Sequence, residues 1–325
     1  GDVEVEVPRE SLTQAPKVVV EGLEVAVELK PAVRGVTVGV EKPSLRDLRS
    51  DLGRLIDALE GMGFKRSPNP RLRVLRRVSS ALRDGGWRVR VIHHAELGVL
   101  DVLPPDEAGG VYGLALDVGT TKLASYLINL ETGRTVSVKS IPNPQIRYGE
   151  DVISRISYAS DQARALELQK AVVGGVNRLI ELACGDAGVS PRSIYEVVAV
   201  GNTAMHHLLL GLSPKTLGLA PFTPIVQDSL DIEASRLGLN VNESANLHLL
   251  PVVAGFVGAD AVADILATRV YMSERPSMVI DVGTNTEVVL SVDGDLYACS
   301  CASGPAFEGA RITHGMRAGV GAIET

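Results

Sequence analysis

Two segments that could each hold a phosphate group lie far apart in this chain and share one pattern. Residues 117–122 read DVGTTK and residues 281–286 read DVGTNT, each between two apolar runs. Each is therefore expected to form a strand, a tight turn and a second strand, because the glycine permits a positive φ. Backbone N–H groups in such a turn can bind a phosphate, while the aspartate faces a metal ion or its water ligands.

The two segments supply most of the candidate site residues. Asp117 and Asp281 are expected to act in catalysis and to hold magnesium through water. Contacts to nucleotide phosphates are expected from the turn residues Gly119, Thr120, Thr121, Lys122, Gly283, Thr284, Asn285 and Thr286. Lys122 either contacts a β- or γ-phosphate or is a solvated lysine. Glu287, assigned to the matching place in the second copy, either orders a water or magnesium shell or faces solvent.

The flanks of the two segments repeat as well. Residues 113–140 and 277–300 each read as three strands joined by two turns. An internal repeat of this size predicts a duplicated domain with a cleft between its halves. Two such hairpins facing each other would clamp a nucleotide tail from both sides.

Two further places carry candidate polar groups. Glu150 and Asp151 either supply a general base near the γ-phosphate or stabilise the N-terminus of a helix through its dipole. Gly201 and Asn202 end a predicted strand and precede a predicted helix over residues 204–210, a turn that favours anion binding. Asn202 either bonds the ligand or caps that helix, and the capping role is favoured.

Composition excludes several classes of protein. The chain has 325 residues, of which 45% are hydrophobic, and a net charge of −7. This length and hydrophobicity predict at least two domains with substantial cores. The charge argues against nucleic acid as a partner, and no apolar run is long enough to predict a membrane span. Three sparse cysteines, two of them in Cys299-Ser300-Cys301, predict a reducing, cytoplasmic location and match no iron–sulfur spacing.

The order of elements predicts a small α/β domain over residues 1–108. A strand is expected over residues 17–30, and a helix is expected to start at Ser44 with Asp47 completing a capping box. The proline- and glycine-rich residues 104–110 are the clearest linker. A larger domain is expected over residues 109–325, with its first half at 109–260 and the start of its second half at 261–325.

Three longer strings identify a family that the chain resembles. They are NPQIRYGEDVISRI at 143–156, VGNTAMHH at 200–207 and SGPAFEGA at 303–310. With the duplicated hairpins, these strings resemble the ATP-dependent reductive activators of corrinoid iron–sulfur proteins, in the acetate and sugar kinase, Hsp70 and actin superfamily. The resemblance implies an actin-like, ribonuclease H-like ATPase domain after the small α/β domain. It also implies that Gly304 and Pro305 border the nucleotide cleft.

The resemblance implies a function as well. ATP and Mg²⁺ would be the cofactors, and their binding or hydrolysis would drive reduction of cobalt(II) to cobalt(I) in a corrinoid protein. An electron donor protein would be the second partner, and a 2Fe–2S cluster is expected only in an N-terminal domain that this chain lacks. The alternatives are a small-molecule kinase of the acetate or sugar kinase type and a non-enzymatic actin- or Hsp70-like binding module.

The resemblance also predicts that the ATPase domain is C-terminally incomplete here. The superfamily's glycine-rich adenosine loop is expected after Thr325, the last residue. Nucleotide affinity and activity of this chain alone are therefore expected to be weak or absent. Unpaired sheet edges left by such a truncation predict pairing between chains, and hence a homodimer.

Overall fold

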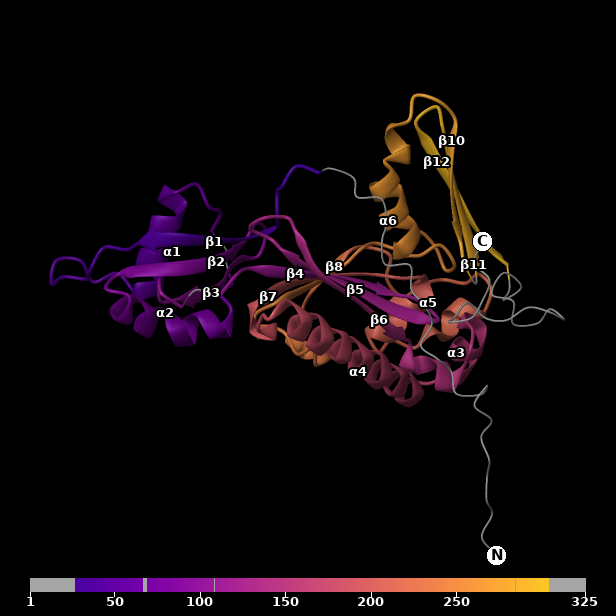
Figure 1. Cartoon of the computed structure of the whole chain (residues 1–325), viewed down its shortest axis with the longest axis horizontal. Coiled ribbons are helices and arrows are strands. Elements are labelled where there is room, and N and C mark those ends of the chain that lie inside the picture. Colours follow the sequence, from indigo (N-terminus) through magenta and orange to yellow (C-terminus); the bar gives the residue numbers. More distant parts are fainter. Residues whose placement is uncertain (1–26, 67–68, 108, 284, 304–325) are drawn as a thin grey trace, which may run out of the picture.

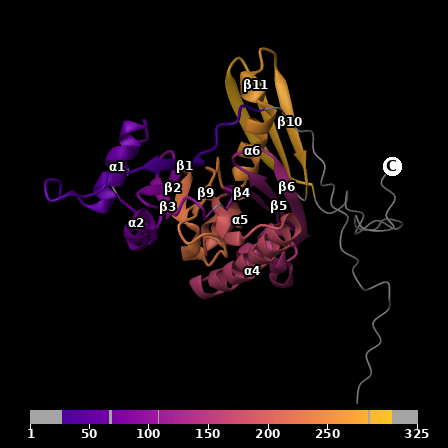
Figure 2. The ribbon, with the colours of Figure 1, turned by 60° about the vertical axis from the view of Figure 1, so that its left-hand side comes forward.

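The computed structural model describes residues 27–66, 69–107, 109–283 and 285–303. The strands of these residues form three separate sheets, and helices pack beside each sheet (Figure 1). In Figure 1 the first unit lies on the left, the largest in the centre, and the third above the right-hand part of the largest. The rotated view in Figure 2 keeps the same three units apart.

The first unit is an antiparallel sheet in the order β1-β2-β3 with two helices on one face. Its elements are β1 Val33–Gly39, α1 Asp51–Gly61, α2 Leu72–Asp84, β2 Arg88–His94 and β3 Gly98–Leu103. Neighbouring residues of a strand point to opposite faces. Val91 of β2 therefore packs under the helices, whereas Ile92 packs toward the central unit, beside Tyr195.

One expectation for this unit is wrong, and a second lies mostly outside the described residues. The helix after Ser44 begins only at Asp51, because Ser50 accepts the capping hydrogen bond from the Gly53 N–H group at 3.1 Å. Asp47 instead bonds to arginine side chains, and no helix starts beside it. The strand expected over residues 17–30 lies mostly outside the described residues, and residues 27–30 form no strand.

The central unit is a six-stranded mixed sheet in the order β6-β5-β4-β7-β9-β8. Its strands are β4 Tyr112–Val118, β5 Lys122–Asn129, β6 Thr135–Pro142, β7 Ile194–Val200, β8 Leu230–Glu233 and β9 Asn246–Leu249. β4 pairs antiparallel with β5 and parallel with β7. The first duplicated segment therefore lies at the β4–β5 turn, beside the carboxyl end of β7.

Helices cover one face of this sheet and form the largest core. They are α3 Val152–Tyr158, α4 Gln162–Ala187 and α5 Thr203–Leu209. Helix α4 starts where Asp161 accepts a hydrogen bond from the Arg164 N–H group and ends at Gly188, whose φ of 65° is left-handed. Its apolar face buries Leu168 and Leu179 against the sheet. This long helix gives the β4–β5 hairpin a rigid base.

The third unit contains the second duplicated segment. It consists of α6 Ala259–Thr268 and an antiparallel sheet of β10 Ser277–Val282, β11 Asn285–Val292 and β12 Asp295–Ala302. Helix α6 packs against β10 and β11 and also contacts β7 of the central sheet (Figure 1). It therefore joins the two units that carry the duplicated segments. No helix among the described residues is long and apolar enough to cross a membrane.

Candidate nucleotide-binding site

The two duplicated aspartates lie close enough together for their charges to interact. The charge of Asp281, at the end of β10, acts on Asp117, at the end of β4. Two residues of α6, Asp260 and Asp264, act on Asp117 as well. The prediction that the two hairpins confront each other therefore has electrostatic support. Helix α6 completes the site with two carboxylates that sequence reasoning missed.

The carboxylates of this site repel one another. Loss of hydration, followed by the charges of Asp260, Asp281 and Asp264, raises the pKa of Asp117 to about 6, although its side chain keeps contact with solvent. Loss of hydration and the charges of Asp281 and Asp260 likewise raise the pKa of Asp264 to about 6. The pKa of Asp260 is raised mainly by burial. A cation placed among these groups would relieve the repulsion.

The same acidic cluster includes Glu287 on β11. Burial raises its pKa to about 7, and the charges of Asp260, Asp281 and Asp264 add to the shift. Glu287 accepts a hydrogen bond from the Ser300 hydroxyl at 2.9 Å, which opposes the shift. Glu287 lies directly opposite Asp281 in the β10–β11 register. Glu287 is therefore a buried acid whose pKa lies near neutral pH, and it does not face solvent.

The carboxylates suit magnesium that is bound partly through water. Among the described residues, no group of three His, Cys, Asp or Glu side chains is arranged to hold a metal ion directly. Mg²⁺ usually keeps several waters and binds one or two carboxylates together with substrate phosphates. The mutually repelling carboxylates of Asp117 and Asp264 fit that pattern.

The β4–β5 turn presents its backbone in a way that suits phosphate. The Gly119 carbonyl accepts a hydrogen bond from the Asn143 side chain at 2.8 Å, and the Thr121 carbonyl accepts one from the Asn143 N–H group at 2.8 Å. The Thr120 carbonyl accepts one from Arg155 at 2.6 Å. In the described part of the chain, no hydrogen bond from the N–H groups of residues 119–121 is found. Those N–H groups are available to an anion.

Close backbone contacts explain both glycines at this turn. A Cβ atom on Gly119 would lie 2.7 Å from the Lys122 carbonyl oxygen. A Cβ atom on Gly201 would lie 2.6 Å from the Val118 carbonyl oxygen. Gly119 does not have the positive φ that was expected of it, so the close approach of the Lys122 carbonyl is what requires a glycine there. Gly201 permits the end of β7 to approach the turn.

Asn202 has the capping role that was favoured, and its side chain also contacts the β4–β5 turn. Its side-chain oxygen accepts a hydrogen bond from the Met205 N–H group at 3.0 Å, which caps α5. Its side-chain nitrogen donates to the Thr120 hydroxyl at 2.9 Å. The neighbouring Gly201 carbonyl accepts from the Ala259 N–H group at 3.0 Å, so the same turn fixes the start of α6.

The second turn is one residue shorter than the first. Four residues separate the paired Val118 and Leu123, but three separate the paired Val282 and Thr286. The assignment of Glu287 to the place of Lys122 is therefore wrong, because counting from each aspartate aligns Lys122 with Thr286. The shorter turn places Glu287 opposite Asp281, where the first hairpin has Ala124.

The remaining predicted residues fall into three groups. Asp151 caps α3 in a capping box with Ser154, and Glu150 is exposed, so their catalytic role stays a prediction. Lys122 and Asn285 are half-buried at the two turns, and the Thr286 hydroxyl contacts Ser303. Outside the described residues lie Thr284, Gly304 and Pro305.

Sequence reasoning missed functional residues on other elements. Asp260 and Asp264 stand four residues apart and so share one face of α6, a spacing that could have marked them. Asn143 and Arg155 lie within the string at 143–156 but carried no assigned role. Nothing in the local sequence shows that these side chains reach the β4–β5 turn.

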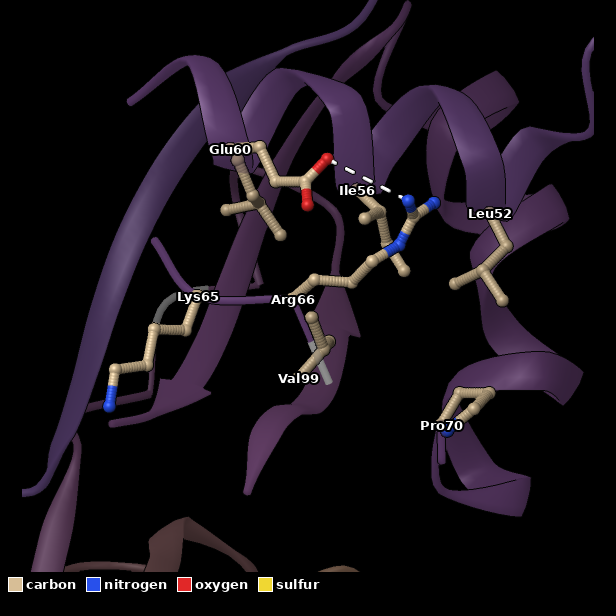
Figure 3. Close-up of a pocket in the computed structure, with 8 residues that line it drawn as sticks. Leu52, Ile56, Glu60, Lys65, Arg66, Pro70 and Val99 are labelled. Atoms are coloured by element: carbon tan, nitrogen blue, oxygen red, sulfur yellow. Dashed lines mark ion pairs between the residues drawn. The ribbon is translucent and has the colours of Figure 1, made fainter. Parts of the chain in front are cut away.

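Two hollows on the protein lie away from this site. One, of about 10 Å³ between α1 and β3, is lined by Leu52, Ile56 and Val99 and crossed by the Arg66–Glu60 ion pair at 3.9 Å (Figure 3). That volume suits at most one water molecule. The other, an open hollow of about 490 Å³, lies beside Arg269 and Met278. Neither contains a predicted site residue.

The cysteines and the paired histidines do not join the site. Cys299 and Cys301 are exposed on one face of β12. His206 and His207 are buried in α5, and His207 accepts a hydrogen bond from the Ile225 N–H group at 2.9 Å. These groups are structural or surface features of the described chain.

Three protein-family models match consecutive parts of the chain, which together make up almost all of it. A model described as the RACo linker region matches residues 22–109, and one described as the RACo middle region matches residues 112–273. A third, described as the C-terminal domain of RACo, the ASKHA domain, matches residues 275–325. The three matches follow one another in the order of the three structural units.

Individual proteins give the same picture. The corrinoid activation enzyme RamQ of Eubacterium limosum is 37% identical over 228 residues, which are 70% of this chain and 38% of that protein. The Co(II) methylated amine-specific corrinoid protein reductase of Methanosarcina barkeri is 31% identical over 230 residues, 66% of this chain and 40% of that protein.

A solved structure described as a reductive activator for corrinoid, iron-sulfur protein matches with a TM-score of 0.83 at 32% identity. The match covers 96% of this chain and 52% of that chain. The chain therefore spans about half the length, or less, of these relatives. The expected fold class, a small α/β domain followed by an actin-like ATPase domain, is confirmed.

Proposed function

Because this chain belongs to the RACo family of reductive activators of corrinoid proteins, we propose that it binds Mg–ATP between its two hairpins and couples that binding to cobalt reduction. The partner would be a corrinoid protein, which accepts one electron and passes from cobalt(II) to cobalt(I). The electron would come from a separate donor protein. ATP supplies a second source of free energy for a step that is uphill with ordinary donors.

One observation carries the proposal. The N–H groups of the β4–β5 turn are free in the described structure, and Asp117, which directly precedes the turn, belongs to a cluster of mutually repelling carboxylates. The N–H groups suit the negative oxygens of a polyphosphate, and the carboxylates suit the cation that accompanies it. A site with only one of these features would fit a simple anion or a simple cation. Together they fit a metal–polyphosphate complex.

Each residue has a role in this proposal. Gly119, Thr120 and Thr121 would bind phosphate oxygens through their N–H groups, and Asp117 and Asp281 would hold the waters of the magnesium ion. When bound, magnesium would neutralise phosphate charge and favour attack at the terminal phosphorus. Asp260 and Asp264, on the helix that joins the two units, would link occupancy of the site to the position of the third unit.

Calorimetry of the chain with ATP and Mg²⁺ tests the binding step. We expect weak binding that requires Mg²⁺ and is lost in Asp117→Asn. Binding of equal strength without Mg²⁺, or none at millimolar ATP, would contradict the proposed site. Tight binding would contradict the expectation that adenosine contacts lie elsewhere in the longer relatives.

The coupled reaction needs its own assay. Because weak or absent activity is expected of this chain alone, a full-length protein that contains it is mixed with a cobalt(II) corrinoid protein, a strong reductant and Mg–ATP, and the cobalt(I) absorption spectrum is recorded. Under the proposal, cobalt(I) formation depends on ATP, and Asp106→Asn, at an exposed residue of the connection before β4, behaves as wild type. ATP-independent reduction would overturn the coupling, even if calorimetry shows that the site binds Mg–ATP.

A further inference from the structure

The most unusual buried group near the site is Arg155 of α3. Its side chain is fully buried, and no ion pair to it is found among the described residues. Burial lowers its pKa to about 10, so it stays positively charged at neutral pH. The charge of Asp151, which caps α3, opposes that shift, but a buried cation with no carboxylate within ion-pair distance is still costly to folding. Its retention therefore calls for a compensating role.

The hydrogen bonds of Arg155 connect the β4–β5 turn to two other segments. Its Nη2 donates to the Thr120 carbonyl at 2.6 Å, and its Nε donates to the Gly149 carbonyl at 2.9 Å. Its Nη1 lies 3.3 Å from the Met205 sulfur on α5. One side chain thus joins the β4–β5 turn to the segment before α3 and to the helix that Asn202 caps.

Asn143 completes the support from the same string. Its side chain donates to the Gly119 carbonyl and also accepts from the Gln145 N–H group at 2.9 Å, so its orientation is fixed. Its own N–H group donates to the Thr121 carbonyl. All three carbonyls of the turn are therefore held by two residues.

The planarity of the peptide bond gives this arrangement a consequence. In a trans peptide, the carbonyl of one residue and the N–H group of the next point in opposite directions. Holding the Gly119 and Thr120 carbonyls toward Asn143 and Arg155 therefore turns the N–H groups of Thr120 and Thr121 away from them. The hydrogen bonds to the two carbonyls therefore set the direction in which the two free N–H groups point.

We propose that Arg155 and Asn143 are positioning residues that preset the β4–β5 turn for a polyphosphate, and that the buried charge of Arg155 adds to its attraction for the anion. This inference rests on the proposed function, because it assumes that the turn binds phosphate. Preset donors cost no reorganisation on binding. The attraction is stronger than in water because the guanidinium lies in a low-dielectric interior.

The test uses the full chain, Mg²⁺ and inorganic tripolyphosphate, with calorimetry for affinity and ¹⁵N-threonine labelling for the turn. Arg155→Lys keeps the charge but loses the paired donors. Asn143→Ser keeps a capping oxygen but loses the donor to Gly119. Arg178→Lys is the matched control, because Arg178 is exposed on α4 and pairs with Glu181.

We expect either site variant to weaken tripolyphosphate binding by about tenfold, a factor that corresponds to one or two hydrogen bonds. The amide signals of Thr120 and Thr121 should shift in the ligand-free variants, while the control keeps wild-type affinity and signals. If Arg155→Lys does not fold, Asn143→Ser decides the matter alone. Unchanged affinity and unchanged threonine signals in a folded site variant would overturn the inference.

The same experiment separates the two proposals. A wild-type chain that binds no Mg–tripolyphosphate would overturn the proposed function and this inference together. A wild-type chain that binds, with site variants that bind equally well, would leave the function standing and remove the positioning role.

Discussion

The two hairpins share a sequence pattern but are supported differently. The first lies in a six-stranded sheet, and side chains from three other segments hold its turn. The second lies in a three-stranded sheet, one face of which exposes Met278, Ile280 and Tyr297. The same few residues therefore lie in a large sheet with a preset turn in one place and in a small, partly exposed sheet in the other. Support comes from distant segments and not from the repeated pattern.

The largest expected difference concerns the turn glycines. Gly119→Ala would place a Cβ atom 2.7 Å from a backbone oxygen, whereas Gly283→Ala would place one 3.1 Å from the Asn285 oxygen. We expect the first change to lower the free energy of unfolding by about 2 kcal/mol and the second by less than about 1 kcal/mol. Urea unfolding of both variants measures this. Equal losses would show that the two turns are equally constrained.

A second prediction concerns pH. A carboxyl whose pKa is higher in the folded than in the unfolded state favours folding at low pH, and this contribution is lost as pH rises through the folded pKa. For Asp117 the window runs from its ordinary value of 3.8 to about 6. In Mg²⁺-free buffer, Asp117→Asn should therefore gain melting temperature relative to wild type between these pH values and keep a constant lead above them.

The control for that prediction is Asp106→Asn, at the exposed connection before β4. Its melting temperature should follow wild type at every pH. Addition of Mg²⁺ should reduce the lead of Asp117→Asn, because the cation stabilises only the carboxylate form. A lead that does not change with pH would argue against repulsion within the acidic cluster.

Glu287 offers a change of intermediate size in the second hairpin. Glu287→Gln keeps an oxygen for the Ser300 hydroxyl but removes a buried acid whose pKa is about 7. We expect the affinity of wild type for Mg–ATP to differ between pH 6 and pH 8, because this acid ionises in that range. The affinity of the variant should differ less between the two pH values. Calorimetry at both pH values measures it. Parallel pH profiles would remove Glu287 from the site.

The smallest expected effect is at Asn202. Asn202→Asp keeps the oxygen that caps α5 but loses the donor to the Thr120 hydroxyl. We expect the affinity for Mg–ATP to fall about fivefold, as the loss of one neutral hydrogen bond predicts. The added negative charge also contributes to this fall. A matched Asn202→Ser variant, which also caps helices, separates the two causes. Wild-type affinity in both would leave Asn202 as a cap alone.

The sequence predicted much of the fold, whereas the roles of its candidate site residues stay a prediction. The three strands expected in each of residues 113–140 and 277–300 correspond to β4–β6 and β10–β12, and the repeated aspartates predicted a shared cleft. Ser44 was misplaced as a cap because several polar residues precede α1, and only tertiary contacts decide among them. Arg155 and Asp260 went unrecognised because their roles arise from packing between segments that are distant in sequence.

The most direct test of the central claim replaces Mg²⁺ with Mn²⁺, which takes the same oxygen ligands and broadens nearby NMR signals. The chain, labelled on backbone nitrogen, is titrated with Mn–ATP, and the amide signals of Thr121 and Asn285 are followed. Binding between the hairpins predicts that both signals broaden together, at the same low Mn²⁺ concentration. Broadening of one without the other, or of neither, would contradict a shared metal–polyphosphate site.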